Sequence, residues 1–184
     1  MRLCVFCASS ESIDPSYRQL AEQVGTAIAL RGWDLVTGGG RVSMMGAVAR
    51  AVRAGGRHTL GVIPQGLVHR EDADSDADEL VVVQDMRSRK GLMDARADAF
   101  LALPGGIGTL EELLEVWTAR SLGLHHKPVV VLDPTGLLRP LRTLVEGLAA
   151  QGFVRASGLA ALTWATSVDE ALDACAQAPS GVSP

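Results

Sequence analysis

Hydrophobic residues along the chain form short apolar runs that alternate with longer segments in which apolar residues recur every three to four positions. The apolar runs, bounded by Gly and Pro, predict strands at 2–7, 34–37, 58–63, 80–84, 98–103 and 128–132, with a weaker one at 161–164. The helical spacing predicts helices at 15–31, 43–54, 87–97, 109–122, 137–151 and 168–177. Strands and helices that alternate in this way indicate an α/β protein with a mostly parallel sheet.

The predicted strands are apolar at nearly every position, which is typical of strands buried on both faces. We therefore expect a Rossmann-like, doubly wound sheet of about seven strands with helices on both faces. No break in composition marks a linker, and 184 residues of which 47% are hydrophobic suit one core. The expected organisation is a single domain over residues 1–184, with a disordered tail at the last few residues.

Charge and cysteine content exclude several functional classes. The 17 basic and 21 acidic residues give a net charge of −4, which does not favour nucleic-acid binding. No apolar stretch reaches the length of a membrane span, and the N-terminus has no signal-peptide pattern, so we expect a cytoplasmic protein. Cys4 and Cys7 lie three residues apart on one strand and point to opposite faces, so we expect buried thiols and no metal site.

Several segments that carry polar or glycine residues follow directly after predicted strands. In an open parallel sheet, ligands bind at the carboxyl ends of the strands, so these segments should share one edge. They are residues 8–10, 38–40, 64 onward, 87–90 and 104–106. The acidic stretch 71–79 is best interpreted as a solvated loop, except for Glu71, which follows the third strand and its Pro64 turn.

The segment from Pro104 to Glu112 reads Pro-Gly-Gly-Ile-Gly-Thr-Leu-Glu-Glu and predicts a phosphate-binding loop. Gly105, Gly106 and Gly108 allow close backbone approach, and the helix predicted to begin near Thr109 presents free N–H groups to an anion. The turn 38–40 before another helix has the same features more weakly. Because neither turn has the Lys-Ser/Thr of a Walker A loop and the first turn lacks a dinucleotide fingerprint, we expect a single phosphate group.

Glu112 has two interpretations. The run from Thr109 to Glu112 has the spacing of a capping box, in which the glutamate binds the start of its own helix. A second run with this spacing, from Ser167 to Glu170, lies away from any candidate site. Spacing alone favours the structural role, whereas a carboxylate one turn into a phosphate-binding helix favours a functional one.

Arg87, Arg89 and Lys90 begin one predicted helix, where positive charge opposes the helix dipole. This local misfit indicates that an anion is bound nearby.

Taken together, these segments resemble the Lonely Guy family, the cytokinin riboside 5′-monophosphate phosphoribohydrolases. The family pattern Pro-Gly-Gly-x-Gly-Thr-x-x-Glu is met at 104–112, and Met-x-x-Arg-Lys is met at 86–90. Further matches are Val-Phe-Cys-Ala-Ser-Ser at 5–10, Gly-Val-Ile-Pro at 61–64, Arg70-Glu71 and Asp98-Ala99-Phe100, so that the resemblance covers about residues 2–165. The chain departs from the family pattern at Ser43 for Gly, Met44 for Leu and Arg87 for a common His.

The resemblance implies hydrolysis of the N-glycosidic bond of an adenosine 5′-monophosphate, often N6-prenylated, to free base and ribose 5-phosphate. It assigns the catalytic roles to Glu112, beside the ribosyl centre, and Arg89, at the departing base. It also implies a homodimer, a nucleoside monophosphate as the only ligand, and no metal or organic cofactor. The residues it places at the substrate are Ser10, Gly39, Gly40, Glu71, Lys90, Gly105, Gly106, Ile107, Gly108, Thr109, Leu110, Glu111 and Thr118.

Two alternatives stay open at this point. One is a general purine nucleoside-5′-monophosphate nucleosidase for salvage, and the other is a non-catalytic nucleotide-binding or carrier module. Proteins of this family have often been labelled lysine decarboxylases. That chemistry needs a lysine to bind pyridoxal phosphate, and Lys90 and Lys127 are the only lysines in the chain.

Overall fold

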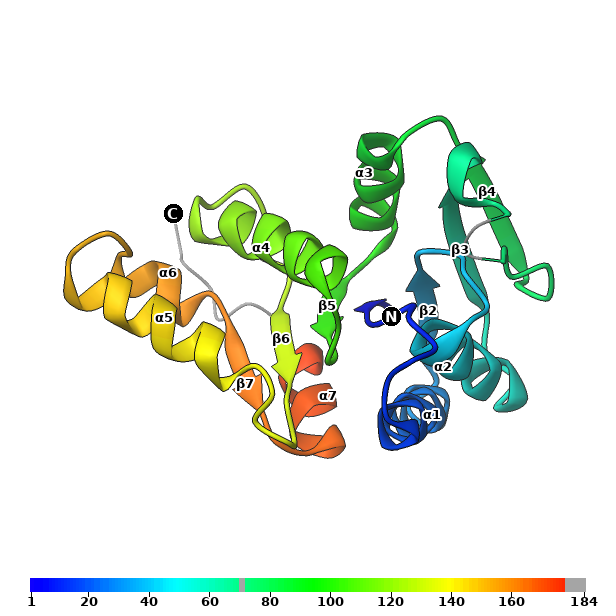
Figure 1. Cartoon of the computed structure of the whole chain (residues 1–184), viewed down its shortest axis with the longest axis horizontal. Helices are drawn as coiled ribbons and strands as arrows, with labels where there is room; N and C mark the ends of the chain where they lie inside the picture. Colours follow the sequence, from blue (N-terminus) through cyan, green and yellow to red (C-terminus); the bar gives the residue numbers. More distant parts are fainter. Residues whose placement is uncertain (70–71, 178–184) are drawn as a thin grey trace.

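The computed structural model describes residues 1–69 and 72–177 and contains a seven-stranded parallel sheet (Figure 1). The strands follow the order β4-β3-β2-β1-β5-β6-β7 across the sheet. Their bounds are β1 Arg2–Phe6, β2 Asp34–Thr37, β3 Thr59–Pro64, β4 Glu79–Val83, β5 Ala99–Ala102, β6 Val129–Leu132 and β7 Thr163–Ala165.

The order of the strands reverses at β1. From β1 the chain builds outward through β2, β3 and β4, and then returns to place β5 on the other side of β1. β1 and β5 pair in register from Leu3 with Ala99 to Phe6 with Ala102, so the segments that follow them separate at one point of the edge. Sheets of this topology bind ligands in the crevice at this reversal.

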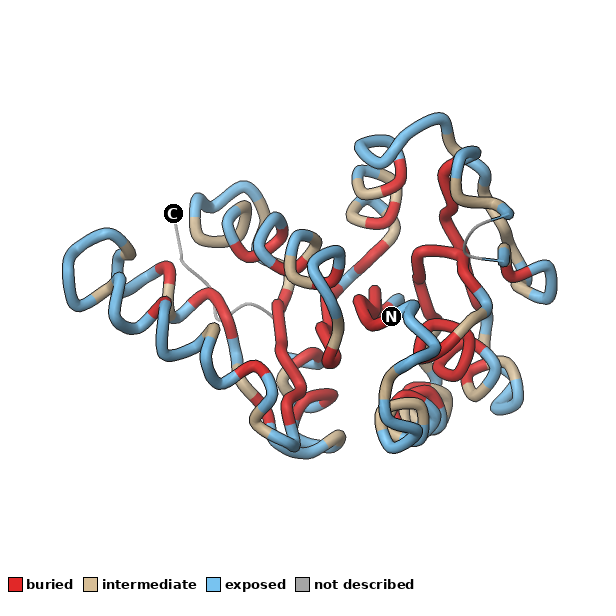
Figure 2. Tube along the Cα trace, viewed as in Figure 1, coloured by how far each residue is buried: buried red, intermediate tan, exposed pale blue. Residues whose placement is uncertain are grey.

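Helices cover both faces of the sheet (Figure 1). On one face, side chains of α1, α2 and α7 pack into one apolar core, and on the other side those of α3, α4 and α5, with the segment around α6, pack into a second. Figure 2 shows the buried strands between the two layers. The helix bounds are α1 Pro15–Leu30, α2 Ser43–Ala54, α3 Met86–Arg96, α4 Ile107–Ser121, α5 Arg139–Ala150, α6 Ala156–Ala160 and α7 Val168–Ala176, with a 3₁₀ helix η1 at Gln65–Leu67.

The predicted doubly wound α/β fold is confirmed, and the predicted strand ends differ from the observed ones by at most two residues. The short helices η1 and α6 were not predicted, because three and five residues are too few to show a helical period. The start of α4 was predicted two residues too late, at Thr109 instead of Ile107. Because α4 begins earlier than predicted, Glu112 lies further from the helix start than the sequence suggested.

The acidic stretch is not simply a solvated loop. Asp74 is buried, and its carboxylate accepts hydrogen bonds from both terminal nitrogens of Arg53 on α2, at 2.8 and 3.3 Å. The Asp78 carboxylate accepts bonds from the N–H and hydroxyl of Thr59, at 2.8 and 2.9 Å, and these bonds lower its pKa. Two of the acidic residues therefore attach the segment to α2 and β3. The prediction failed because these partners are distant in sequence.

The cysteines are buried and unbridged, as predicted, and Cys4 and Cys7 face opposite sides of the sheet. Among the described residues, no helix combines the length and apolar character needed to cross a membrane. Glu71 and the predicted C-terminal tail, 178–184, lie outside the described residues.

Candidate active site

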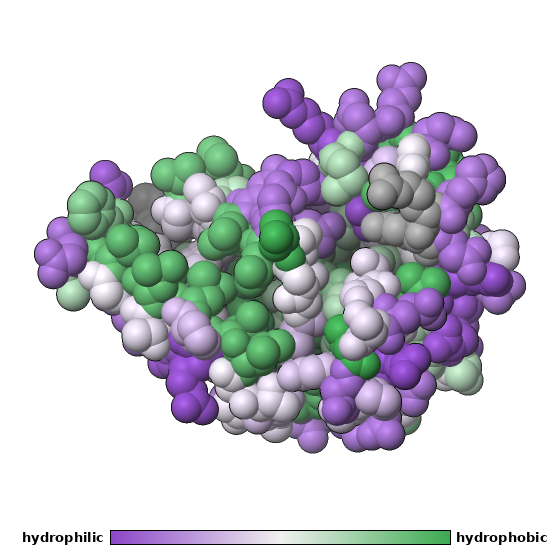
Figure 3. All heavy atoms as spheres, in the orientation of Figure 1, coloured by the Kyte–Doolittle hydropathy of each residue, from purple (hydrophilic) through white to green (hydrophobic). Residues whose placement is uncertain are grey.

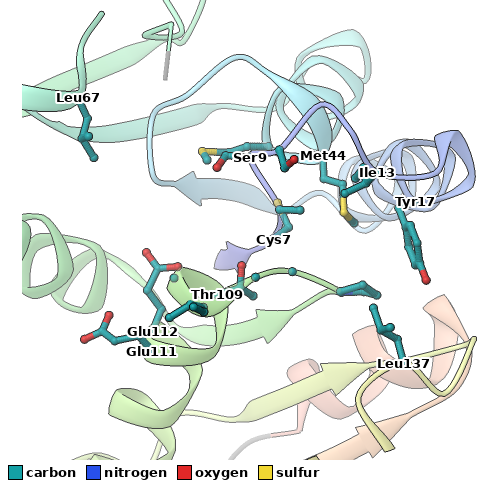
Figure 4. A pocket seen from close by; sticks show the side chains of 18 of the residues that line it. Cys7, Ser9, Ile13, Tyr17, Met44, Leu67, Thr109, Glu111, Glu112 and Leu137 are labelled. Atoms are coloured by element: carbon teal, nitrogen blue, oxygen red, sulfur yellow. The ribbon is translucent and has the colours of Figure 1, made fainter. Parts of the chain in front are cut away.

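A cavity of about 520 Å³ opens at the carboxyl ends of β1 and β5, where the strand order reverses. We name it the β1–β5 cavity; Figure 4 shows it between the start of α4 and the segment that follows β1. Tyr17 and Leu137 lie toward one end and Leu67 toward the other. Its lining residues are Cys7, Ala8, Ser9, Ser10, Ile13, Tyr17, Met44, Met45, Leu67, Met86, Arg89, Pro104, Gly105, Gly106, Ile107, Gly108, Thr109, Glu111, Glu112 and Leu137.

The first turn of α4 forms one wall of the cavity. Gly106 is the N-cap and has no side-chain cap, and the first backbone bond of the helix runs from the N–H of Leu110 to the carbonyl of Gly106, at 3.0 Å. The preceding N–H groups of an α-helix have no acceptor within the helix and bind anions. A Cβ on Gly105 would lie 2.2 Å from the Thr109 hydroxyl, so only glycine fits this approach. This wall can hold a phosphate.

The capping-box interpretation of Glu112 is wrong. Because α4 begins at Ile107, Thr109 is its third residue and Glu112 its sixth, too far along for the carboxylate to serve the cap position. The matching run at α7 does form a cap. Ser167 Oγ accepts from the N–H of Glu170 at 3.3 Å, and the Glu170 carboxylate accepts from the N–H of Thr166 at 2.8 Å, which lowers the pKa of Glu170.

Glu112 instead lines the β1–β5 cavity, together with Arg89. Five residues of helical rise place it roughly 7.5 Å along α4 from Ile107. Both charges also act on the end of β1. Burial raises the pKa of the Cys4 thiol, the Glu112 carboxylate raises it further and the Arg89 guanidinium lowers it. Burial and then Glu112 also raise the pKa of Cys7. Both an acidic and a basic residue therefore line the cavity.

Arg89 is buried on α3, and Gly38 provides the space for it. Arg89 Nη2 donates to the Gly38 carbonyl at 3.0 Å, and a Cβ at Gly38 would lie 1.7 Å from the same nitrogen. The basic first turn of α3 is partly balanced by its N-cap, Asp85, whose carboxylate accepts from the N–H of Ser88 at 2.8 Å. This bond lowers the pKa of Asp85. Arg87, by contrast, is exposed and does not line the cavity.

Both lysines are engaged in ion pairs. Lys90 Nζ binds Glu111 and, at 2.9 Å, Glu115, and the bond to Glu111 is the main cause of its raised pKa. Lys127 Nζ binds the Asp94 carboxylate at 2.7 Å. Neither lysine lines the β1–β5 cavity, so neither is placed to form an imine with a cofactor bound there.

The structure brings together most of the predicted site residues and separates others. Those that line the β1–β5 cavity are Ser10, Arg89, Gly105, Gly106, Ile107, Gly108, Thr109, Glu111 and Glu112. Those that do not line it are Gly39, Gly40, Lys90, Leu110 and Thr118, while Glu71 lies outside the described residues.

The turn at Gly38–Gly40 faces the protein interior. Gly39 has a φ of +78° and packs against Val62 and Ile63, and the N–H of Gly40 donates to the sulfur of Met45 at 3.2 Å. The turn therefore packs against β3 and α2 and does not line the β1–β5 cavity.

Sequence reasoning missed five lining residues. Ile13, Tyr17, Leu67, Met86 and Leu137 reach the cavity from α1 and the segment before it, η1, the first position of α3 and the loop before α5. Met86 begins the Met-x-x-Arg-Lys run but was not assigned to the site, and the other four belong to no motif.

Ser43, one of the departures from the family pattern, begins α2 with a φ of +50°. A left-handed conformation costs a non-glycine residue roughly 1–2 kcal/mol, which explains the glycine of the pattern. The Ser43 hydroxyl donates to the carbonyl of Ser10 at 2.5 Å. The serine thus fastens the start of α2 to the loop after β1, which lines the cavity.

Comparison with known proteins identifies relatives along almost the whole chain. A family model described as possible lysine decarboxylase matches residues 45–175. The cytokinin riboside 5′-monophosphate phosphoribohydrolase of Mycobacterium marinum is 53% identical over 174 residues, covering 95% of this chain and 92% of that protein. Relatives of the same name from Mycobacterium tuberculosis and Arabidopsis thaliana are 51% and 50% identical, covering 95% and 83% of this chain and 92% and 70% of their own lengths.

Solved structures share the fold at lower identity. The molybdenum cofactor carrier protein of Chlamydomonas reinhardtii has a TM-score of 0.71 at 22% identity, and the match covers 94% of both chains. The molybdenum cofactor binding protein of Rippkaea orientalis has a TM-score of 0.70 at 24% identity, covering 94% of this chain and 93% of that one. These likenesses support the architecture alone. From its sequence relatives, this chain belongs to the Lonely Guy family, the family of the cytokinin riboside 5′-monophosphate phosphoribohydrolases.

Proposed function

We propose that this protein hydrolyses the N-glycosidic bond of N6-prenylated adenosine 5′-monophosphates, releasing the free cytokinin base and ribose 5-phosphate. One observation carries the proposal: an anion-binding helix start and the carboxylate of Glu112 lie along one wall of the same cavity, with Arg89 beside them. The names of relatives that are 50–53% identical support the same reaction.

The spacing along α4 suits a ribose 5-phosphate. With the phosphate at the N–H groups of Ile107, Gly108 and Thr109, the sugar extends along the helix toward Glu112. The separation of roughly 7.5 Å between the first residue and Glu112 is comparable with the length of a ribose 5-phosphate unit. The phosphate thus anchors the substrate at a distance from the bond that breaks, and its binding energy can orient the sugar.

Glu112 has two uses at the ribosyl carbon. As the C1′–N bond breaks, its electron pair leaves with the base and positive charge develops on the ribose, which a carboxylate stabilises. The same carboxylate can accept a proton from the attacking water. Arg89, on the neighbouring wall, provides positive charge where the departing base becomes electron-rich. The chain's own residues therefore cover both ends of the breaking bond.

The specificity test compares phosphorylated and unphosphorylated substrates. The purified protein should release free base from AMP and N6-isopentenyladenosine monophosphate and leave the corresponding nucleosides intact. Equal turnover of adenosine and AMP would contradict the phosphate anchor. Including GMP and CMP in the same series separates a cytokinin enzyme from a general purine nucleoside-5′-monophosphate nucleosidase, since only the latter should cleave GMP at a comparable rate.

The catalytic role of Glu112 is tested by Glu112→Gln, which keeps the size of the side chain and removes its charge. We expect kcat to fall by about 10²–10⁴-fold, the usual contribution of a general acid or base, with AMP binding retained. Glu170→Gln is the matched control, since Glu170 serves the start of α7 and lies away from the cavity. Unchanged turnover in Glu112→Gln would contradict a catalytic role for Glu112, whereas AMP binding without turnover in the native protein would favour a nucleotide carrier.

We further propose that the protein is a cytoplasmic homodimer. Three buried, unbridged cysteines suit a reducing compartment. Apolar side chains gather over α5 and its flanking loops (Figure 3), where Leu137, Leu144, Leu148 and Phe153 are exposed. Light scattering should give the mass of two chains for the native protein and of one for Leu144→Glu, whereas a monomeric native protein would contradict the proposal.

A further inference from the structure

A second cavity, of about 150 Å³, lies between α3 and α4 and shares the side chain of Glu112 with the β1–β5 cavity. We name it the α3–α4 cavity. Helix α3 lines it with residues that include Gly91 and Asp94, and α4 with residues that include Glu115 and Ala119. Glu112 lines both cavities, so this residue lies between them.

The α3–α4 cavity has an apolar floor and charged walls. Its floor includes the stacked rings of Phe6 and Phe100, whose centroids are 5.9 Å apart. Lys90 crosses from α3 to α4, where it binds Glu111 and Glu115. The polar and ionisable side chains that line the cavity are Lys90, Asp94, Glu112, Glu115 and His125.

These dimensions and this lining suit water. At roughly 30 Å³ for each molecule, the space admits about five waters. Cavities that stay dry are lined by apolar groups, whereas five ionisable side chains line this one, and waters there can also bond to one another. The α3–α4 cavity is therefore expected to be hydrated beside the Glu112 carboxylate.

The next step rests on the function proposed above. A nucleotide in the β1–β5 cavity covers the face of Glu112 that lines that cavity and displaces the water there. The hydrolysis still requires one water molecule within reach of the carboxylate. We propose that the α3–α4 cavity supplies this water, and that the side chains lining it from α3 and α4 determine how readily water reaches Glu112.

The step balances as an ordinary hydrolysis. The C1′–N bond breaks with its electron pair on the base, and the oxygen of a water from the α3–α4 cavity forms the new bond to C1′. One proton of that water passes to the Glu112 carboxylate, and the departing base takes up one proton from solvent. Glu112 then returns its proton to the remaining waters of the cavity.

Ala119→Leu tests the proposal by filling the cavity from α4 without adding atoms to the β1–β5 cavity. We expect kcat for AMP to fall by about tenfold, a barrier increase of about 1.4 kcal/mol, with KM and the melting temperature unchanged. Ala95→Leu makes the same change at an exposed position of α3 that lines neither cavity, and should leave both constants unchanged.

Measuring kcat and KM separately distinguishes a variant that blocks the water supply from one that displaces α4. If the added side chain moved α4, the phosphate-binding turn would move with it and KM would rise. A kcat within about threefold of the native value, or a fall in kcat matched by a rise in KM, would overturn the proposal.

Gly91→Leu repeats the test from α3, because a Cβ at Gly91 meets no atom within 4 Å, and it decides the question should Ala119→Leu not fold. If the native protein itself releases no base from AMP, the proposed function fails. If the native protein is active and both variants keep its kcat, only the water cavity is wrong.

Discussion

The two glycine-rich turns at the carboxyl edge of the sheet are similar in sequence and differ in their surroundings. Gly38–Gly40 follows β2 and precedes α2, and Gly105–Gly108 follows β5 and leads into the first turn of α4. Only the second lines the β1–β5 cavity. The difference is in what occupies the space that the missing side chains leave.

At the first turn the protein itself fills that space. The Arg89 guanidinium lies where a Cβ of Gly38 would be, and Gly39 lies against β3. At the second turn, Cβ atoms at Gly106 and Gly108 would meet no atom within 4 Å. Glycine spacing therefore predicts a close approach, and the three-dimensional neighbours decide whether a side chain or a substrate makes it. The first turn positions Arg89, and the second remains open to an anion.

The largest effect within this comparison is expected from Gly38→Ala, which displaces Arg89 without changing it. A Cβ only 1.7 Å from Nη2 forces the guanidinium to move, and a misplacement of about 1 Å can cost about 10²-fold in rate. We expect kcat to fall by about that factor in steady-state assays with AMP. Gly147→Ala, on the exposed face of α5 with no atom within 4 Å of its Cβ, is the control. If Gly38→Ala kept the native kcat, the observed position of the Arg89 guanidinium would not matter for catalysis.

Gly105→Ala should act on substrate binding. Its Cβ would overlap the side chain of Thr109, with Oγ1 at 2.2 Å, so the first turn of α4 must shift. We expect the KM for AMP to rise by about tenfold, which corresponds to a loss of about 1.4 kcal/mol in binding. Gly147→Ala is again the control, because its Cβ has open space and it does not line the cavity, and a similar rise there would indicate a general effect of the substitution.

Ser43→Gly should have a smaller effect that divides between stability and binding. Glycine removes the roughly 1–2 kcal/mol strain of the left-handed φ and also removes the bond to Ser10, worth roughly 1 kcal/mol. We therefore expect a nearly unchanged melting temperature and a KM for AMP raised about twofold to threefold, as the loop after β1 is less constrained. An unchanged KM would limit the serine to a structural role.

Ser167→Ala measures how much a helix cap contributes to stability at a position away from the candidate site. Loss of the cap should cost about 1 kcal/mol, or about 2–4 °C in melting temperature, with activity per folded molecule unchanged. A fall in activity there would show that the site is sensitive to changes in stability anywhere in the chain. The Gly38 and Gly105 results would then need correction for folding.

The smallest effect is a pH dependence at the same cap. The N–H of Thr166 lowers the pKa of Glu170 in the folded protein, so the unfolded chain binds the proton more readily. The contribution of Glu170 to stability is therefore complete above its unfolded pKa and is lost as the pH falls through its lowered folded pKa. The melting temperatures of the native protein and Glu170→Gln should converge over that acidic range. A constant difference would contradict this assignment.

The fold was readable from the sequence because its strands are buried on both faces and its long helices show a clear apolar period. Val129–Leu132 is apolar throughout, and Gly and Pro separate most elements. The short helix α6 escaped, since five residues show no period. Leu114 has the apolar spacing of the buried face of α4 and is nevertheless 41% exposed, because a period does not say how wide a face the sheet covers.

Site residues could be predicted where reactive or glycine-rich segments directly follow a strand. The segment 104–112 and Arg89 both follow strands at the edge, and both line the cavity. Glycine spacing predicted that Gly39 and Gly40 lie at the substrate. It could not show that they pack inward, because their neighbours come from β3 and α2. Lys90 pairs with carboxylates one helix away, and Tyr17 and Leu137 meet the cavity from segments 120 residues apart, which no local pattern encodes.

The proposed binding mode can be observed directly in a crystal structure of Glu112→Gln soaked with N6-isopentenyladenosine monophosphate. We expect an intact nucleotide in the β1–β5 cavity, with its phosphate at the N–H groups of residues 107–109 and its C1′ beside residue 112. A phosphate bound at the 38–40 turn, or a nucleotide whose C1′ lies away from residue 112, would contradict it.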